Sequence, residues 1–244
     1  MVLKETLLRQ IRRLGVDISK FPNADLRRRI TLLNNYNISK ILDVGANSGQ
    51  YSKLMKELGF KGEIISFEPL SDTFKKLQKE SEKYHNWTAV NIALGEMDGD
   101  IQINVSKNSY SSSLLKMLPL HLESAPESIY VRKEVVKINK IDTIFNGFCK
   151  DDDKVFLKID TQGYEIKVLE GARESINKIT GVHLEMSLTP LYEGEALFSN
   201  MLFYMKDLGF DLYSLENGFY NKITGQLLQV DGIFFRHRNK IMFR

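Results

Sequence analysis

The chain has 244 residues, of which 43% are hydrophobic, and this length suits one α/β domain better than two separate domains. Its 34 Lys and Arg residues nearly balance 31 Asp and Glu residues, so the net charge of +3 is too small and too dispersed to indicate a nucleic-acid partner. Cys149 is the only cysteine, which excludes a disulfide within the chain and is compatible with a reducing compartment.

The first 37 residues are predicted to be a helical extension of a domain that covers residues 38–244. Apolar side chains recur at helical spacing among basic ones over residues 3–14, which predicts an amphipathic helix. Such a helix packs on the domain or on a second subunit, which makes a homodimer compatible with the sequence, or it anchors at a membrane surface. The N-terminus lacks the apolar core of a signal peptide, and no apolar run approaches the roughly 20 residues of a membrane span, so we expect a cytoplasmic protein.

Strand-like apolar runs alternate with helical patterns from residue 40 onward, which indicates βαβ units around a mostly parallel sheet. The predicted strands are Lys40–Val44, Glu63–Phe67, Thr88–Asn91, Val155–Ile159 and Gly181–Met186. The predicted helices are Ser48–Leu58, Ser71–Lys83, Glu165–Ile176 and Ala196–Leu208. Two last strands, Phe210–Leu215 and Val230–Arg236, flank turn signals and predict an antiparallel pair at one edge of the sheet. Dinucleotide-binding sheets end differently, because they continue with right-handed parallel crossovers.

Residues 106–135 do not follow this alternation. They contain a serine cluster, two prolines and several large apolar side chains with weak periodicity. Long irregular segments in compact domains are commonly functional or disordered, and the apolar content here favours ordering over a substrate. We therefore predict a lid-like insertion near residues 106–135.

A glycine-bearing turn joins the first predicted strand to the first predicted helix, in the segment ILDVGANSGQ. Gly45 and Gly49 would allow the backbone to approach a ligand closely. A dinucleotide turn has the pattern G-x-G-x-x-G and holds a pyrophosphate at the helix N-terminus. Here the pattern is Asp43-x-Gly45-x-Asn47-x-Gly49, with Gln50 at the third glycine position. The Asp43 carboxylate would repel a phosphate and suits a cationic group, such as the ammonium group of S-adenosylmethionine; an ordinary strand-to-helix turn is the alternative.

The second and third predicted strands end in residues that suit a nucleoside. Glu68 follows the second strand, where an acid can accept hydrogen bonds from both ribose hydroxyls of NAD or S-adenosylmethionine. Alone it could be a solvated strand-end carboxylate, but together with the Asp43 turn it indicates a nucleoside site. Ala93 and Leu94 would offer an apolar edge and backbone groups to the adenine, although a buried strand end followed by a turn explains them nearly as well.

Carboxylates also end the fourth and fifth predicted strands. Asp160 stands at the carboxyl edge of the sheet, where open α/β folds bind ligands. We expect Asp160 to contact the cofactor and to orient or deprotonate the attacking group, or to hold a metal; the alternative is a cap on the helix that begins near Gly163. Glu185 would share the site, since two nearby acids commonly divide into base and orienting roles. His183 lies on the same face of that strand and is more typical of a structural histidine.

Two other classes of site lack their sequence patterns. His85, His121 and His237 show no metal-ligand spacing, so we expect no dedicated zinc site and assign no metal ligand. The phosphate-binding pattern G-x-x-x-x-G-K-[ST] is absent, which disfavours a kinase or an ATPase.

The motifs occur together and in a fixed order. Over residues 38–236 the chain resembles the FkbM-type methyltransferases, a branch of the Rossmann-like enzymes that depend on S-adenosylmethionine. The resemblance is carried by ILDVGANSGQYS, FEP, NIALG, SSSL, LKIDTQGYEIKVLEGA and VDGIFFR. It implies an α/β fold of the class I methyltransferase type, with a seven-stranded, mostly parallel sheet, an antiparallel edge strand and helices on both faces.

The same resemblance implies an activity. Members of the family look like O-methyltransferases that use S-adenosylmethionine as cofactor and commonly act on hydroxyls of sugars or secondary metabolites. We therefore expect methyl transfer to a hydroxyl of a small-molecule acceptor, with Asp160 as the first candidate for a general base and Glu185 beside it. A non-catalytic nucleoside-binding protein is the alternative. An NAD-dependent oxidoreductase is less favoured, because of Asp43 and the missing third glycine.

Overall fold

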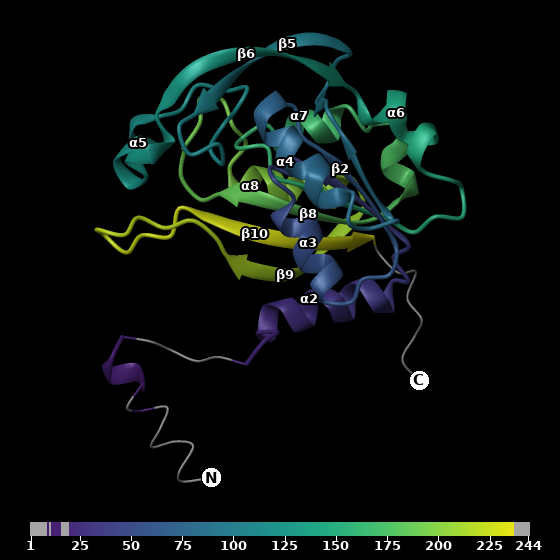
Figure 1. Cartoon of the computed structure of the whole chain (residues 1–244), viewed down its shortest axis with the longest axis horizontal. Helices are drawn as coiled ribbons and strands as arrows, with labels where there is room; N and C mark the ends of the chain where they lie inside the picture. Colours follow the sequence, from purple (N-terminus) through teal and green to yellow (C-terminus); the bar gives the residue numbers. More distant parts are fainter. Residues whose placement is uncertain (1–8, 10, 16–19, 237–244) are drawn as a thin grey trace.

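Seven strands form the central sheet of the computed structural model, which describes residues 9, 11–15 and 20–236. They are β1 (Lys40–Val44), β2 (Glu63–Phe67), β3 (Trp87–Val90), β7 (Val155–Ile159), β8 (Ile179–Ser187), β9 (Phe210–Asn217) and β10 (Gln229–Arg236). Their spatial order is β3-β2-β1-β7-β8-β10-β9 (Figure 1). β10 runs antiparallel to both its neighbours, and the other pairs are parallel. The predicted α/β class and the mostly parallel sheet with an antiparallel pair at one edge are confirmed.

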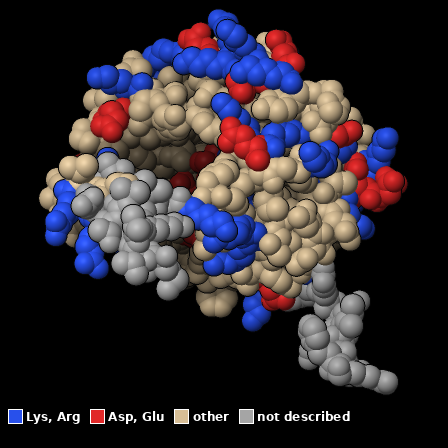
Figure 2. Space-filling model, turned by 60° about the horizontal axis from the view of Figure 1, so that its bottom comes forward, with Lys and Arg blue, Asp and Glu red and all other residues tan. Residues whose placement is uncertain are grey.

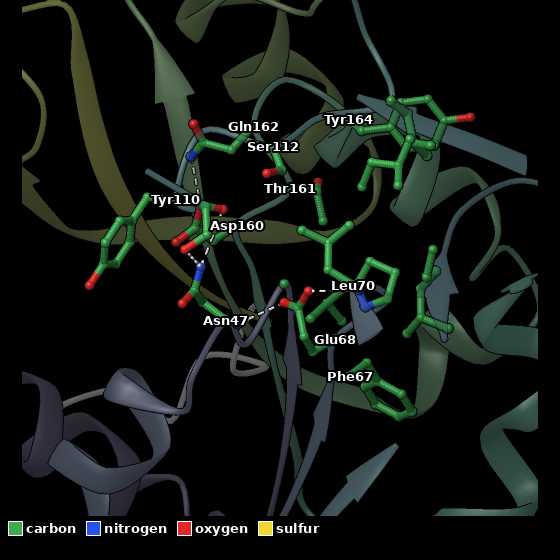
Figure 3. Close-up of a pocket in the computed structure, with 18 of the residues that line it drawn as sticks. Asn47, Phe67, Glu68, Leu70, Tyr110, Ser112, Asp160, Thr161, Gln162 and Tyr164 are labelled. Carbon is green, nitrogen blue, oxygen red and sulfur yellow. Dashed lines mark hydrogen bonds between the residues drawn. The ribbon is translucent and has the colours of Figure 1, made fainter. Parts of the chain in front are cut away.

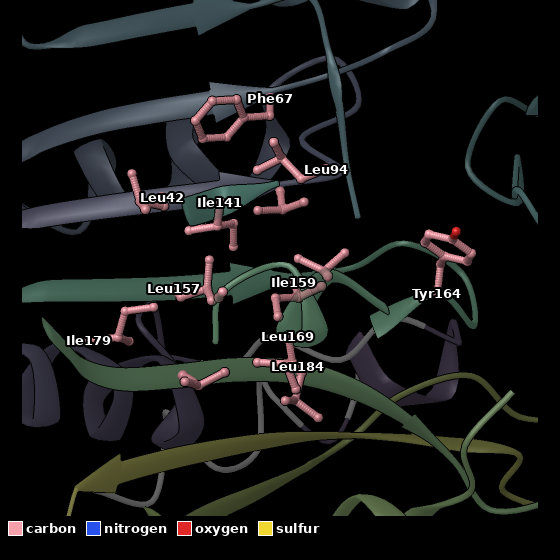
Figure 4. Packing of buried hydrophobic residues seen from close by; sticks show 14 of the residues in the cluster. Leu42, Phe67, Leu94, Ile141, Leu157, Ile159, Tyr164, Leu169, Ile179 and Leu184 are labelled. Atoms are coloured by element: carbon pink, nitrogen blue, oxygen red, sulfur yellow. The ribbon is translucent and has the colours of Figure 1, made fainter. Parts of the chain in front are cut away.

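Helices cover both faces of this sheet. α2 (Ala24–Asn35), α3 (Gln50–Glu57) and α4 (Ser71–Ser81) pack on one face, and α6 (Ile141–Phe148), α7 (Glu165–Glu170) and α8 (Phe198–Asp207) pack on the other. Each face has its own hydrophobic core, the first beneath α2, α3 and α4 and the second beneath α6, α7 and α8. Successive strand residues point to opposite faces, so Ile41 lies in the first core and Leu42 in the second. Figure 4 shows the second core, where Leu157 and Leu184 lie on adjacent strands. Burial on both faces explains why these strands read as continuous apolar runs.

The helix predicted over Glu165–Ile176 is shorter than expected, because α7 ends at Glu170. The Asp142 carboxylate accepts the main-chain N–H groups of Glu174 and Ser175 at 3.1 and 2.8 Å, so these donors leave the helical pattern. A short 3₁₀ turn over Ser175–Lys178 follows instead. A side-chain acceptor from α6, distant in sequence, thus ends the helix.

The strands of a second, three-stranded sheet flank the segment for which we expected an irregular insertion. This sheet consists of β4 (Ala93–Leu94), β6 (Tyr130–Asn139) and β5 (Gly99–Ser106), in the order β4-β6-β5. In Figure 1 the long strands β5 and β6 arch over the helices on one side of the main sheet. The expectation of irregular chain up to residue 135 is therefore wrong: β6 begins at Tyr130, and α5 (Pro119–Ser124) interrupts the connection.

The structure describes α2 as the helix of the N-terminal extension that meets the domain. Leu33 is buried in the first core, and the Arg29 side chain forms a buried ion pair with Glu216 on β9. The amphipathic helix expected over residues 3–14 lies largely outside the described residues. Within residues 9, 11–15 and 20–236, none of the helices has both the length and the apolar character needed to cross a membrane.

Candidate active site

A cavity of about 280 Å³ opens at the carboxyl edge of the parallel strands. It lies where the strand order reverses, between β1 with β2 on one side and β7 with β8 on the other. Open α/β sheets bind their ligands at such a switch point. Its lining consists of Val44, Gly45, Asn47, Phe67, Glu68, Pro69, Leu70, Ile92, Ala93, Leu94, Ile103, Ser109, Tyr110, Ser112, Leu114, Asp160, Thr161, Gln162, Tyr164 and Glu185 (Figure 3).

The structure brings most of the sequence-predicted residues to this one cavity. Seven of the nine line it: Gly45, Asn47, Glu68, Ala93, Leu94, Asp160 and Glu185. Asp43 and Gly49 do not line it. The two exceptions have separate causes.

Asp43 is fully buried beneath the cavity floor. Its carboxylate accepts hydrogen bonds from Ser52 Oγ at 2.6 Å and Ser66 Oγ at 3.1 Å, and it lies 3.1 Å from Lys158 Nζ. With a cation and two hydroxyls as partners, it has no need of a ligand. Asp43 therefore forms an internal ion pair, and the expectation that it meets the cationic end of a ligand is not met. This ion pair holds Lys158 beneath Asp160, and the distance from Lys158 Nζ to Asp160 Oδ2 is 3.6 Å.

The two glycines of the turn are required by close contacts inside the protein. Gly45 has φ +72°, and a Cβ there would lie 1.8 Å from the carbonyl oxygen of Asp160. Gly49 has φ +91°, and a Cβ there would lie 2.8 Å from the Trp87 ring. From the sequence we expected both glycines to allow the approach of a ligand. In the structure, Gly45 instead lets the β1 loop touch the β7 loop, which closes the cavity floor.

Glu68 is almost completely buried at the end of β2, with 5% of its surface exposed. Its Oε2 accepts the N–H of Asn47 and its Oε1 accepts the N–H of Leu70, both at 2.9 Å (Figure 3). Burial raises the pKa of Glu68 to about 7, against the lowering effect of these two N–H donors. A carboxylate has about four acceptor positions, so two remain for a ligand in the cavity.

The cavity is apolar next to Glu68. Phe67, Leu70 and Ile92 line it from the β2 and β3 side, and Ile103 and Leu114 line it from the second sheet and the segment that follows β5. The Tyr164 ring lies at the same end, and its hydroxyl donates to Glu96 at 2.7 Å. This part of the cavity therefore suits a flat, mostly apolar ring.

Asp160 and Glu185 are joined by a residue that sequence reasoning missed, Gln162. Its Nε2 donates to Asp160 Oδ1 at 2.9 Å and to Glu185 Oε2 at 3.0 Å. Burial, and next the negative charge of Asp160, raise the pKa of Glu185 well above its ordinary value. Gln162 has φ +57°, a conformation that is uncommon without glycine. The only sequence signal was its place in the DTQG turn after β7.

Glu165 shapes the turn that carries Gln162. Its Oε1 accepts the N–H of Thr161 at 2.8 Å and that of Gly163 at 3.3 Å. Burial raises its pKa to about 7. The alternative role for Asp160, a cap on the following helix, is not seen: α7 has no side-chain cap, and Asp160 bonds to Gln162 instead.

Residues 106–115 border the cavity opposite the glycine turn. The carbonyl of Ser109 accepts from Asn47 Nδ2 at 3.3 Å, and the Tyr110 hydroxyl accepts from Gln50 Nε2 at 3.1 Å. Ser113 Oγ donates to the carbonyl of Gln162 at 2.7 Å. Ser109 and Tyr110 thus contact the wall that carries the glycine turn, and Ser113 of the SSSL motif contacts the wall that carries Gln162.

Among the described residues, the cavity lining carries three acidic side chains, Glu68, Asp160 and Glu185, and no Lys, Arg or His. On the face drawn in Figure 2, acidic side chains lie inside a hollow of the surface, and both acidic and basic side chains lie on the outside around it. Within the part of the chain that the structure describes, no three His, Cys, Asp or Glu side chains are grouped to hold a metal ion. The charge of the cavity therefore favours a neutral or cationic ligand.

Comparisons with solved structures give likenesses of fold at low identity. An uncharacterized protein from Listeria monocytogenes serotype 4b is 8% identical, with a TM-score of 0.50 over 91% of this chain and 71% of that chain. Magnesium protoporphyrin IX methyltransferase from Synechocystis, solved with S-adenosylmethionine, is 11% identical, with a TM-score of 0.47 over 87% and 78%. TrmK from M. capricolum, solved with S-adenosylhomocysteine, is 9% identical, with a TM-score of 0.49 over 90% and 70%. No curated protein matches the sequence.

A family model gives the stronger finding. The model described as the methyltransferase FkbM domain matches residues 43–212. This range includes every residue of the cavity lining, from Val44 to Glu185. Because the match covers more than half of the sequence, the chain belongs to the FkbM methyltransferase family.

Proposed function

We propose that the protein transfers a methyl group from S-adenosylmethionine to a hydroxyl of a sugar or small metabolite. The observation that carries this proposal is one cavity with two chemically different ends. Glu68 and an apolar wall lie at one end, and the linked carboxylates Asp160 and Glu185 lie at the other. The first end suits a nucleoside and the second suits a reacting hydroxyl group.

The residues present fit S-adenosylmethionine. Glu68 has two acceptor positions left for the ribose hydroxyls, and the wall that includes Leu70, Ala93 and Leu94 suits the adenine. The cofactor supplies an activated methyl group on a positively charged sulfur. Since the described lining residues include three acidic side chains and no cationic one, that charge is favoured there.

The chain's own part in the reaction is to hold the acceptor and to exclude water. Methyl transfer is an in-line displacement, so orientation of the acceptor oxygen can supply much of the rate. Asp160 and Glu185 present carboxylate oxygens to a hydroxyl that enters the cavity. The segment that includes Ser109 and Tyr110 covers one side, and we propose that it acts as the lid of the site.

The same observations weigh against the two alternatives. In this cavity the pyrophosphate of NAD would meet no cationic side chain among the described lining residues, so its charge would be buried without a partner. A protein that only binds nucleosides has no need of two carboxylates joined by one amide group. Here Gln162 donates to both Asp160 and Glu185, and Gln229 donates to Glu185 as well.

Thermal unfolding with separate additions of S-adenosylmethionine, S-adenosylhomocysteine and NAD tests the cofactor. A ligand that binds the native state raises the midpoint, and at a hundred times its Kd it adds about 2.7 kcal/mol. We expect a rise with the first two ligands and none with NAD. Labelled S-adenosylmethionine with a panel of hydroxylated sugars and small metabolites then tests transfer. A rise with NAD alone would contradict the proposal.

A further inference from the structure

The two oxygens of the Glu185 carboxylate have different surroundings. Oε2 accepts from Gln162 Nε2 at 3.0 Å and from Gln229 Nε2 at 2.7 Å. The described part of the chain provides no hydrogen bond to Oε1, and Glu185 lines the cavity. One oxygen is therefore anchored by two amide donors, while the other can accept a proton from a ligand.

Asp160 is placed differently, although it shares the same amide donor. Its Oδ1 accepts from Gln162 Nε2 at 2.9 Å, and its Oδ2 lies 3.6 Å from the buried ammonium group of Lys158. Its side chain is 42% exposed. Asp160 thus has a fixed counter-charge and contact with solvent, so we assign it an orienting role.

We infer that Glu185 is the carboxylate that takes the proton of the acceptor hydroxyl, and that Gln162 and Gln229 are positioning residues for it. This inference rests on the proposed function. The acceptor O–H bond breaks and its proton passes to Glu185 Oε1. The oxygen forms a bond to the methyl carbon, the carbon–sulfur bond breaks, and its electron pair stays on sulfur. Glu185 then releases the proton to solvent.

The charges around Glu185 support this role. Burial and nearby carboxylates raise its pKa, while Lys158 acts in the opposite direction. A general base works best when its pKa lies near the pH of the reaction, which an ordinary glutamate does not reach. Among the described residues, the titratable groups that act on Glu185 are Lys158 from β7, Asp160 directly after it, Glu165 from α7, Asp231 from β10, and Tyr192.

The orientation of the Gln162 amide is set by its other contacts. Its Oε1 accepts from the hydroxyl of the buried Tyr192 at 2.8 Å, which directs Nε2 toward the two carboxylates. Ser113 Oγ donates to its main-chain carbonyl, which helps to hold the uncommon backbone conformation at φ +57°. The amide therefore occupies the space between Asp160 and Glu185 and fixes their separation.

A carboxyl titration tests the inference without an identified acceptor. Protein labelled with [δ-¹³C]glutamate is titrated by NMR with S-adenosylhomocysteine present, and the resonance lost in Glu185→Gln is assigned to Glu185. We expect the Glu185 resonance to titrate at a pH well above that of exposed glutamates. Asp160→Asn should move it to lower pH, because a like charge is lost. Gln162→Met should move it to higher pH by about one unit, because a donor to the charged form is lost.

Two further variants control this titration. Gln229→Met removes the other amide donor, leaves the partner of Tyr192 in place, and should shift the resonance in the same direction as Gln162→Met. Gln78→Met, at an exposed position of α4, should leave the titration unchanged. A Glu185 that titrates with the exposed glutamates overturns the inference. Absence of S-adenosylhomocysteine binding contradicts the proposed function instead, and the Glu185 titration stays readable.

Turnover gives an independent readout, with labelled S-adenosylmethionine and the best acceptor from the sugar and metabolite panel. Glu185→Gln should lose about a hundredfold in kcat and lose the acidic limb of the pH profile. Asp160→Asn should keep that limb, displaced to lower pH. The opposite pattern, a limb that persists in Glu185→Gln and vanishes in Asp160→Asn, assigns the proton to Asp160 and overturns the inference.

Discussion

The replacement Glu68→Gln tests the cofactor end of the cavity most directly. The Glu68 carboxylate uses one acceptor position on each oxygen for the N–H groups of Asn47 and Leu70. A glutamine has a single acceptor oxygen, so it cannot serve both N–H groups and two ribose hydroxyls. A hydrogen bond to a charged group contributes about 1.5–3 kcal/mol, so we expect the Kd for S-adenosylhomocysteine to rise by roughly 10- to 150-fold.

The pH dependence of the wild type follows from the raised pKa of Glu68. Burial moves it from 4.5 to about 7, so the folded state favours the protonated form relative to the unfolded state. The stability from this group is fully present below pH 4.5 and is lost as the pH rises through about 7, a change of about 3 kcal/mol. Hydrogen bonds donated by the ribose hydroxyls of a ligand favour the ionised form of Glu68. Affinity for S-adenosylhomocysteine should therefore increase through about pH 7 in the wild type and stay flat in Glu68→Gln.

Calorimetric titration with S-adenosylhomocysteine at several pH values, together with urea unfolding of the free protein, measures both effects. Glu63→Gln is a matched control, because Glu63 starts the same strand with 62% of its side chain exposed. It should leave the affinity unchanged. Equal affinities of wild type and Glu68→Gln above pH 7, or the same pH dependence in both, would refute the argument.

Three other predictions concern different parts of the molecule. Asp160→Ala should lower turnover about tenfold or more while S-adenosylhomocysteine still binds, since it removes an orienting carboxylate and not the nucleoside contacts; calorimetry and labelled transfer separate the two. Gly45→Ala should cost more than about 2 kcal/mol in urea unfolding, because its Cβ would lie 1.8 Å from a carbonyl oxygen, and Gly59→Ala, with φ +90° and no neighbour within 4 Å, should cost less. Arg29→Met should cost about 3–5 kcal/mol, because the buried Glu216 loses its cation; adding Glu216→Gln should restore part of this loss.

Local patterns in the sequence were sufficient to predict the main sheet. Runs such as Lys40–Val44 and Val155–Ile159 are apolar at nearly every position because both faces of these strands are buried, and the predicted and observed bounds agree. The strands β5 and β6 were missed for the opposite reason. Val131 and Val135 on β6 are exposed, and charged residues stand between them, so the segment shows no clear burial pattern.

The candidate site was predictable to the extent that residues at strand ends share one edge of a parallel sheet. Glu68, Asp160 and Glu185 each stand at such an end, and all three line the cavity. Asp43 also stands near a strand end, yet it points beneath the floor, because it pairs with Lys158 at the matching register position of β7. A strand's side-chain alternation does not reveal which neighbouring strand supplies a partner.

The sequence by itself thus determined the α/β class, the ordered motifs of the FkbM family and the strand-end carboxylates. These depend on residue type and on spacing along the chain, which are local properties. The tertiary structure alone decided that Asp43 has an internal partner, that Gly45 is needed by the carbonyl of Asp160, and that Gln162 joins Asp160 to Glu185. Each of these depends on contacts between segments far apart in sequence, and only the packing of β1, β7 and β8 into one sheet creates them.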